Sequence, residues 1–263
     1  MTSGRVVFVG AGPGEADLIT LRGARRLAEA DVVLVDALTD PALRAMAPQA
    51  RWIDVGKRGY GAATRQAAID AMLIAQARAH RLVVRLKGGD PSLFGRLEEE
   101  LQALAAAGIA CEVVPGVTAA LAAAADTRRP LTRRGSGRSV SLATAMTRTG
   151  ALQAGRHADT EVFYMAGRQL GALARALRRA GWPEDTPASV VSRAGWPDRL
   201  ASDHRLADLA AAALLHGGRP TVVTVGAGAQ AVAAVDGPSA AEAGTDGPAA
   251  AGAVHGWAHA PAP

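Results

Sequence analysis

The chain has 263 residues, enough for one large or two small domains at about 150 residues per domain. Hydrophobic residues make up 49% and charged residues 20% of the sequence, which excludes a chain that is disordered or fibrous as a whole. The 29 lysines and arginines against 24 aspartates and glutamates give a net charge of +5. This charge favours an anionic partner without distinguishing nucleic acid, a membrane surface and an acidic small molecule.

Cysteine content and apolar runs indicate a soluble protein from a reducing compartment. The one cysteine, Cys111, can form neither an internal disulfide nor half of a CxxC metal site, so no metal is expected. The first apolar run, 6–9, leads straight into glycines instead of a cleavage site. The longest run, 117–125, is far shorter than the roughly 20 residues that span a bilayer. We therefore expect a cytoplasmic protein with no membrane partner.

Short β-branched segments alternate with alanine-rich helical segments in the first part of the chain. Strands are predicted at 5–9, 31–35, 51–55, 82–86 and 110–114. Helices are predicted after the cap residue Thr20, at 64–79 and at 97–107. Helical spacing places Leu21, Ala24, Leu27 and Ala28 on one face of the first helix. The alternation is typical of βαβ units around a parallel sheet, here an α/β domain over residues 1–115.

Pro115 and Gly116 interrupt this pattern, and a different arrangement follows. A short alanine helix and an arginine-rich loop precede strands near 139–143, 161–165, 188–192 and 221–225. We interpret residues 116–234 as a second α/β domain. Residues 235–263 are mostly Ala, Gly and Pro. They are too poor in large apolar side chains to offset the entropy of ordering, which predicts a disordered tail.

A glycine-rich turn, Val-Gly-Ala-Gly-Pro-Gly at 9–14, follows the first predicted strand. Such a turn lets the backbone approach a ligand and presents amide groups, as in dinucleotide sites. Glu15 occupies the position of the third glycine in GxGxxG and puts a negative charge where a pyrophosphate would lie, which disfavours NAD or FAD. A tight turn without a ligand is the alternative interpretation.

A second glycine-rich loop, within the segment 85–96, follows the fourth predicted strand. It reads Arg-Leu-Lys-Gly-Gly-Asp-Pro-Ser-Leu-Phe-Gly-Arg. Ligands of open α/β sheets bind outside the carboxyl ends of the strands, so both loops are expected at the functional edge. Asp90 precedes Pro91 and is therefore restricted to an extended conformation that aims its carboxylate. The alternative is a charged turn.

Lysine use points to two further positions. Only Lys57 and Lys87 are lysine, and every other member of the 29 cationic residues is arginine. Both follow predicted strands and stand beside or near glycine. Because lysine differs from arginine in point charge, hydration and accessible pKa, its retention suggests a chemical need, although two surviving surface lysines would look the same.

Two more segments could contact a ligand. Thr118, in Pro-Gly-Val-Thr-Ala, can cap the next helix and offer its hydroxyl to a cleft, or the segment can be a plain hinge. The segment 128–134 contains four arginines, which suit carboxylates or phosphates but are also compatible with a solvated face. It lacks the interleaved aromatic residues of a single-strand nucleic-acid platform, so no nucleic-acid partner is expected.

Taken together, these motifs resemble a known family. In order they are Gly-Ala-Gly-Pro-Gly, Asp36, Gly-Lys-Arg-Gly at 56–59, Arg-Leu-Lys-Gly-Gly-Asp-Pro, Pro-Gly-Val-Thr-Ala, Pro-Leu-Thr-x-Arg and Val-Phe-Tyr-Met at 162–165. They occur in the order seen in the uroporphyrinogen-III C-methyltransferases of the tetrapyrrole methylase family. The resemblance covers about 5–229.

The resemblance implies a fold, a reaction and an assembly. The fold would be that of class III methyltransferases, two α/β domains with S-adenosylmethionine held in the cleft between them. The reaction would be C-methylation of uroporphyrinogen III at two ring carbons, C2 and C7, to give precorrin-2, as in sirohaem and cobalamin biosynthesis. The enzyme would use no metal and would be a homodimer. The carboxylates of such a polyanionic substrate would give the basic charge a use.

The resemblance also assigns residues one by one. Cofactor-binding positions would be Pro13, Gly88, Gly89, Asp90, Leu93, Thr118, Ala119, Met165 and Ala194. Asp36 and Lys57 match positions of a proton acceptor and a proton donor. Arg96 and Glu99 match positions linked to deprotonation and substrate binding, and Arg96 is expected to be a substrate anchor because an arginine side chain does not give up its proton in proteins. Arg133 and Arg134 would clamp substrate carboxylates.

The sequence departs from the family pattern at four places. Leu97 and Glu98 stand where the family has two glycines, Ser92 and Leu93 replace a bulkier apolar pair, Arg133 replaces a histidine, and Thr-Ala-Met at 144–146 replaces Thr-Gly-His. The segment Asp-Pro-Ser-Leu at 90–93 suggests a later corrin-ring methylase as an alternative. A nucleotide-binding oxidoreductase using the turn at 9–14, and a non-enzymatic basic binding module, are alternatives from other classes.

Overall fold

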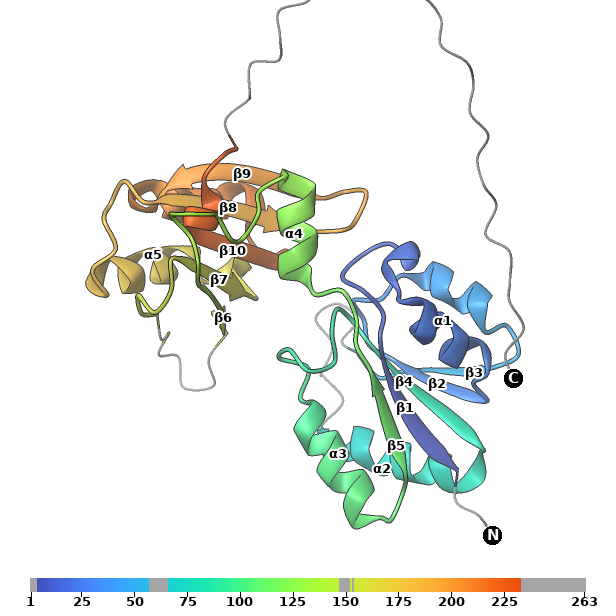
Figure 1. Cartoon of the computed structure of the whole chain (residues 1–263). Coiled ribbons are helices and arrows are strands. Elements are labelled where there is room, and N and C mark those ends of the chain that lie inside the picture. Colours follow the sequence, from blue (N-terminus) through green and yellow to red (C-terminus); the bar gives the residue numbers. More distant parts are fainter. Residues whose placement is uncertain (1–3, 57–65, 147–151, 153, 233–263) are drawn as a thin grey trace, which may run out of the picture. The chain divides into compact units, whose positions relative to one another are not determined.

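The computed structural model describes residues 4–56, 66–146, 152 and 154–232. The described chain contains two five-stranded sheets, both within a compact unit that ends at Ala231 (Figure 1). A second unit, 232–263, lies almost wholly outside the described residues, as does the predicted tail. The first sheet ends before Pro115 and the second begins after Gly116. The domain limits 1–115 and 116–234 stay predictions.

The first sheet is entirely parallel, as predicted, with the order β3-β2-β4-β1-β5. Its strands are β1 (Arg5–Gly10), β2 (Val32–Val35), β3 (Arg51–Asp54), β4 (Leu82–Lys87) and β5 (Cys111–Val114). No strand end differs from its predicted position by more than one residue. The central strands consist of hydrophobic runs because helices cover both faces of the sheet.

Helices cover both faces of the first sheet (Figure 1). They are α1 (Leu21–Ala28), α2 (Gln66–Ala79) and α3 (Leu97–Ala106), with short 3-10 helices η1 (Ala16–Leu18) and η2 (Pro41–Met46). Leu27 of α1 packs with Val7 and Val9 on one face, and Leu73 of α2 and Leu104 of α3 pack with Phe8 on the other.

In the first helix the predicted cap is confirmed, and only part of the predicted face is buried. Thr20 caps α1, with its Oγ1 accepting a hydrogen bond from the Gly23 amide at 3.1 Å. Leu21, however, is 79% exposed, so the buried face consists of Gly23 and Leu27. Leu21 is the first helical residue, and helical spacing does not by itself show where the sheet beneath the helix ends.

The second sheet is mixed, with the order β6-β7-β10-β8-β9. Its strands are β6 (Val140–Thr144), β7 (Thr160–Tyr164), β8 (Pro187–Ser192), β9 (Leu200–Arg205) and β10 (Thr221–Gly226). Strands β6 and β7 are parallel and the other pairs are antiparallel. Strand β9 was not predicted, because its sequence, Leu-Ala-Ser-Asp-His-Arg, is mostly polar and lies at the sheet edge.

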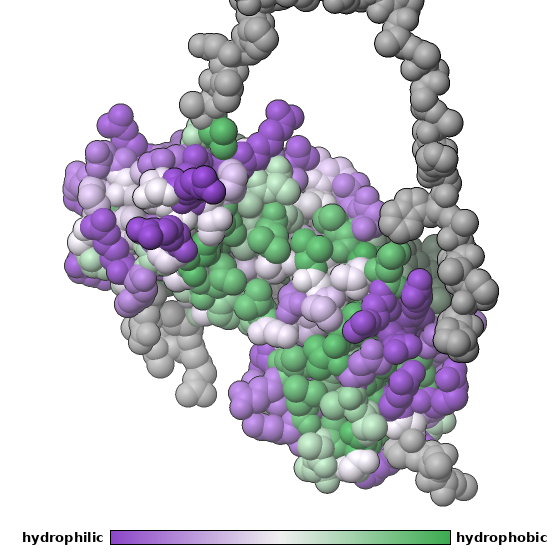
Figure 2. All heavy atoms as spheres, viewed as in Figure 1, coloured by the Kyte–Doolittle hydropathy of each residue, from purple (hydrophilic) through white to green (hydrophobic). Residues whose placement is uncertain are grey.

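Both faces of the second sheet are covered as well. The helices are α4 (Ala119–Thr127), α5 (Leu170–Arg179) and α6 (Ala213–His216), with η3 (Ala166–Arg168), η4 (Leu206–Ala212) and η5 (Ala227–Ala229). Helix α5 and η4 share a core with Phe163 and Val223, whereas α4 packs on Val162 and Val222. Hydrophobic residues show over much of α4 in Figure 2, since this helix is largely alanine and its Leu121 is 55% exposed. No helix in the described ranges is long and apolar enough to cross a membrane.

Core burial on the first sheet gives a stability prediction. Leu104→Ala should lower the free energy of unfolding by about 2–5 kcal/mol, because Leu104 has no exposed surface and its truncation leaves a cavity. Leu121→Ala makes the same chemical change at an exposed helical position and should cost less than about 0.5 kcal/mol. Urea unfolding of both variants measures the difference, and equal losses would contradict the described packing.

Candidate functional site

Two glycine-rich loops meet at the carboxyl edge of the first sheet, as the sequence predicted. One follows β1 and the other follows the adjacent strand β4. The Gly89 amide donates to the Gly12 carbonyl oxygen at 2.7 Å, and the Gly12 amide donates to the Gly89 carbonyl oxygen at 3.3 Å. Both glycines have positive φ, +82° at Gly12 and +70° at Gly89, which a residue with a side chain adopts only under strain.

A third loop, after β5, packs directly on the first two. A Cβ atom at Gly116 would lie 2.3 Å from the Gly89 carbonyl oxygen, so the contact requires glycine. The Asp90 carboxylate fixes the arrangement: Oδ2 accepts from the Gly116 amide at 2.8 Å and Oδ1 from the Ser92 amide at 2.8 Å. The three loops therefore form one hydrogen-bonded unit around Asp90.

Thr118, at the start of α4, adds a side-chain contact that was not predicted. It is the N-cap residue of α4, but its hydroxyl makes no capping bond and instead lies 2.8 Å from the hydroxyl of Tyr164. Burial raises the pKa of Tyr164, which keeps the phenol neutral. The Phe94 ring, 5.1 Å from the Tyr164 ring between centroids, packs beside it. Tyr164 stands within the Val-Phe-Tyr-Met motif, but the family resemblance predicted a cofactor-binding role only for its neighbour, Met165.

The chain around Ala194 lies against the first loop. The Gly195 carbonyl oxygen accepts from the Glu15 amide at 2.8 Å, and a Cβ at Gly14 would lie 1.9 Å from that oxygen. Ala194 is buried, whereas Met165 is 38% exposed with a φ of +57°. Non-glycine residues in this region of φ concentrate at functional sites. These contacts link all the segments that carry the predicted cofactor residues: Pro13, Gly88, Gly89, Asp90, Leu93, Thr118, Ala119, Met165 and Ala194.

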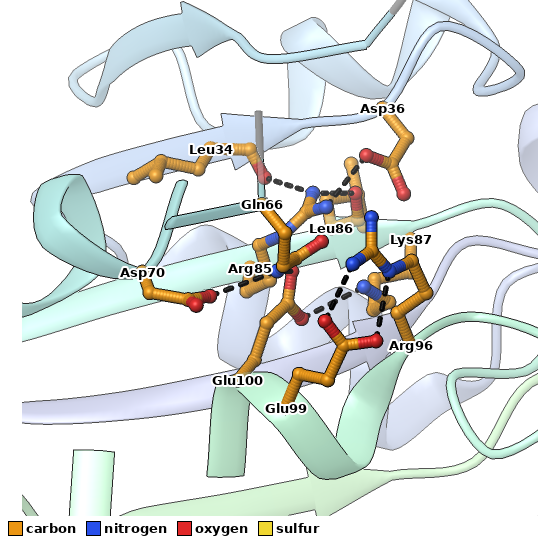
Figure 3. Close-up of polar contacts among 10 residues, drawn as sticks. All are labelled: Leu34, Asp36, Gln66, Asp70, Arg85, Leu86, Lys87, Arg96, Glu99 and Glu100. Carbon is orange, nitrogen blue, oxygen red and sulfur yellow. Dashed lines mark hydrogen bonds and ion pairs between the residues drawn. The ribbon is translucent and has the colours of Figure 1, made fainter. Parts of the chain in front are cut away.

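A buried network of charges lies below the second loop (Figure 3). Glu100 of α3 has no exposed surface, and its carboxylate accepts from Arg85 Nε at 3.1 Å and from Lys87 Nζ at 2.7 Å. A second nitrogen of Arg85 donates to Asp36 Oδ1 at 2.6 Å. The side chain of Asp36 is 31% exposed, against 2% for Arg85 and 3% for Lys87. Asp36 is therefore the member of the network that a ligand can reach.

The two lysines singled out in the sequence have different outcomes. Lys87 is buried, and its burial lowers the pKa of the ammonium group, with the neighbouring Arg85 adding to this effect and Glu100 opposing it. A Cβ at Gly95 would lie 3.1 Å from Lys87 Cε, so the loop packs closely on the lysine side chain at this glycine. Lys57 lies outside the described residues.

Arg96 and Glu99 form an exposed pair at the start of α3. Arg96 donates from Nε to Glu99 Oε1 at 2.9 Å and from its terminal nitrogen to Oε2 at 2.5 Å. These bonds lower the pKa of the Glu99 carboxyl. The side chains are 57% and 48% exposed, so both can meet a ligand. Helix α3 begins at Leu97, which places Arg96 at its N-cap in a left-handed conformation.

Two of the four arginines in the arginine-rich loop bond to other parts of the protein. Arg133 Nε donates to the Ala227 carbonyl oxygen at 2.8 Å, and another nitrogen donates to the Gln230 carbonyl oxygen. Arg129 is paired with Asp203. Arg134 is exposed. The proposed contact with substrate carboxylates therefore suits Arg134, while the observed partners of Arg133 are backbone groups. Within the described ranges, no three His, Cys, Asp or Glu side chains are grouped to hold a metal.

The family of the chain follows from comparison with known proteins. The family model of Tetrapyrrole (Corrin/Porphyrin) Methylases matches residues 5–210. The chain belongs to this family, which favours methyl transfer over the oxidoreductase and non-enzymatic alternatives. Its predicted fold class, α/β with two sheets of the tetrapyrrole methylase type, is confirmed.

Within the family, the chain is similar to several named enzymes. The chain is 45% identical over 193 residues to a uroporphyrinogen-III C-methyltransferase of Pseudomonas aeruginosa, covering 72% of this chain and 79% of that protein. It is 44% identical to a siroheme synthase of Gluconacetobacter diazotrophicus, with 86% of this chain covered, but it spans only 50% of that longer protein. The crystal structure of the Thermus thermophilus uroporphyrin-III C-methyl transferase with S-adenosyl homocysteine matches with a TM-score of 0.75 at 37% identity, covering 85% and 97% of the two chains.

The two adjacent arginines provide a matched test of the arginine-rich loop. Arg133→Ala should lower the free energy of unfolding by about 1–2 kcal/mol, because carbonyl oxygens lose charge-assisted hydrogen bonds. Arg134→Ala, at an exposed position, should change it by less than about 0.5 kcal/mol. Thermal and urea unfolding of the two variants check this, and unaltered stability in Arg133→Ala would show that its backbone contacts contribute nothing.

Proposed function

We propose that this protein transfers methyl groups from S-adenosylmethionine to two ring carbons, C2 and C7, of uroporphyrinogen III, giving precorrin-2. One observation carries the proposal: the three loops at the carboxyl edge of the first sheet form one hydrogen-bonded unit whose residues match the family motifs. The chain as a whole is 45% identical to a uroporphyrinogen-III C-methyltransferase. Cobalt precorrin-4 methyltransferase is also similar, at 30% identity and a TM-score of 0.75. A corrin-ring substrate is therefore the second candidate.

The loop residues suit S-adenosylmethionine. The half-buried backbone of Gly88 and Gly89 can approach a ligand closely, because neither residue has a side chain. The Asp90 carboxylate has lone pairs beyond the two bonds it accepts and is a partner for hydroxyl or ammonium groups. Leu93 and Met165 offer partly exposed apolar surface to a flat ring. When bound, the cofactor supplies an electrophilic methyl group on a sulfonium centre.

The charged residues around this site can hold the substrate and take up the proton that the methylated ring must lose. We propose Asp36 as the proton acceptor and Lys57 as a proton donor. Arg96 and Arg134, both exposed, are proposed to bind and orient the carboxylates of the tetrapyrrole, with Glu99 holding the Arg96 side chain in place. Arginine is suited to this because its planar group binds a carboxylate through two hydrogen bonds. Exclusion of water and positioning would supply the remaining acceleration.

The proposal includes the cellular compartment and the oligomeric state of the enzyme. We propose a cytoplasmic enzyme, since the one cysteine of the sequence, Cys111, is exposed and would remain reduced there. We also propose a homodimer, on the family resemblance. Sedimentation equilibrium of the purified protein tests the assembly, and a monomer at micromolar concentration would contradict it.

One incubation tests the activity. Purified protein, uroporphyrinogen III and S-adenosylmethionine under anaerobic conditions should give a product with two added methyl groups, detected by mass spectrometry. The control omits S-adenosylmethionine. No methylated product, together with methylation of a later corrin-ring intermediate, would transfer the assignment to the second candidate.

Asp90 gives the sharpest test of the cofactor site. Asp90→Ala should weaken S-adenosylhomocysteine binding by about tenfold or more, equivalent to about 1.4 kcal/mol, since it removes a ligand group and releases Gly116. Ser92→Ala is the matched control, because Ser92 contacts Asp90 through its backbone amide, which alanine keeps. Isothermal titration calorimetry compares both with the wild type. Unchanged affinity in Asp90→Ala would remove Asp90 from the site.

A further inference from the structure

Glu100 is a buried carboxylate to which the family motif assigns no role. It lies in the first turn of α3 with no exposed surface. Its Oε1 accepts from Arg85 Nε at 3.1 Å and from Gln66 Nε2 at 3.3 Å, and its Oε2 accepts from Lys87 Nζ at 2.7 Å. A carboxylate in such a position is tolerated only when it is paired and fully hydrogen-bonded.

The guanidinium of Arg85 connects Glu100 to the reactive edge of the sheet (Figure 3). Its Nε binds Glu100, while one terminal nitrogen donates to Asp36 Oδ1 at 2.6 Å. The other terminal nitrogen faces the Leu34 and Leu86 carbonyl oxygens at 3.4 and 3.3 Å. Because the guanidinium is planar and its donors are fixed relative to one another, a bond at Nε determines where the Asp36-binding nitrogen points.

The charges of this network balance only when Glu100 is present. Arg85 and Lys87 are cations, and Asp36 and Glu100 are carboxylates. Without Glu100, two buried cations would share the one partly exposed carboxylate of Asp36. The Arg85 guanidinium would then lose the bond at Nε that fixes its orientation toward Asp36.

We propose that Glu100 is a positioning residue that, through Arg85, sets the orientation of the Asp36 carboxylate for proton transfer. This role rests on the proposed function, in which Asp36 accepts the proton lost from the ring. Glu100 itself has no exposed surface and touches no ligand. Its effect should therefore fall on the rate of the chemical step and not on cofactor or substrate binding.

The test compares two glutamates of the same helix. Glu100→Gln keeps the shape but puts an amide NH₂ against a cationic donor, so kcat should fall by about tenfold to a hundredfold, the cost of slight misplacement. KM for uroporphyrinogen III and the affinity for S-adenosylhomocysteine should stay within about twofold. Glu98→Gln, the same substitution at an exposed position of α3, should match the wild type in all three.

A double-mutant cycle shows whether Glu100 acts through Asp36. In an Asp36→Asn background, Glu100→Gln should cause no further loss of kcat, since the group it orients is already lost. An equal further loss would overturn the proposal, as would wild-type kcat in a folded Glu100→Gln protein. A wild-type protein that methylates no uroporphyrinogen III would instead overturn the proposed function and this role with it.

A second variant covers the case in which Glu100→Gln does not fold. Lys87→Met/Glu100→Met removes one buried positive and one buried negative charge together with the oxygen that accepts from Arg85 Nε, so the remaining Arg85–Asp36 pair is neutral but its orientation is no longer fixed. It should fold, as judged by circular dichroism, and should show the same loss of kcat with unchanged KM. Wild-type kcat in this double variant would overturn the positioning role.

Discussion

The need to neutralise one buried carboxylate organises the edge of the first sheet. Glu100 is completely buried, and two cations from β4 meet it. Because those cations, Arg85 and Lys87, stand at the end of the strand, the pairing ties α3 to the place where the glycine-rich loop departs. Arg85 also holds Asp36, whose side chain is the most exposed of these four charged groups.

The close approach of backbone segments is the second constraint, and it applies to the loops that follow β1, β4 and β5. A side chain at Gly116 would collide with the Gly89 carbonyl oxygen, and Gly12 and Gly89 have positive φ angles that strain a residue with a side chain. Asp90 joins two of the loops through its carboxylate, and the Thr118–Tyr164 hydrogen bond connects α4 to β7. The edge proposed to bind the cofactor is built from backbone groups, and a few polar side chains join its loops.

Sequence patterns predicted the elements that depend on local composition. They did not predict features that depend on contacts between residues distant in the chain. The hydrophobic strands of both sheets and the Thr20 cap were predictable, but the polar edge strand β9 was not. Helical spacing put Leu21 on the same helix face as the buried Leu27, but Leu21 itself is exposed. The motif order located the three loops. The contacts of Tyr164, Glu100 and Arg133 were not predictable, because each depends on residues distant in the chain.

Hydrogen–deuterium exchange with and without S-adenosylhomocysteine tests the central claim most directly, that the three joined loops form the cofactor site. Ligand binding should slow exchange of the amides in 10–14, 88–93 and 116–119 together, because they form one hydrogen-bonded unit. Edge strand β9 (Leu200–Arg205) should exchange as before. Protection of one loop without the others, or protection confined to the second sheet, would contradict the account.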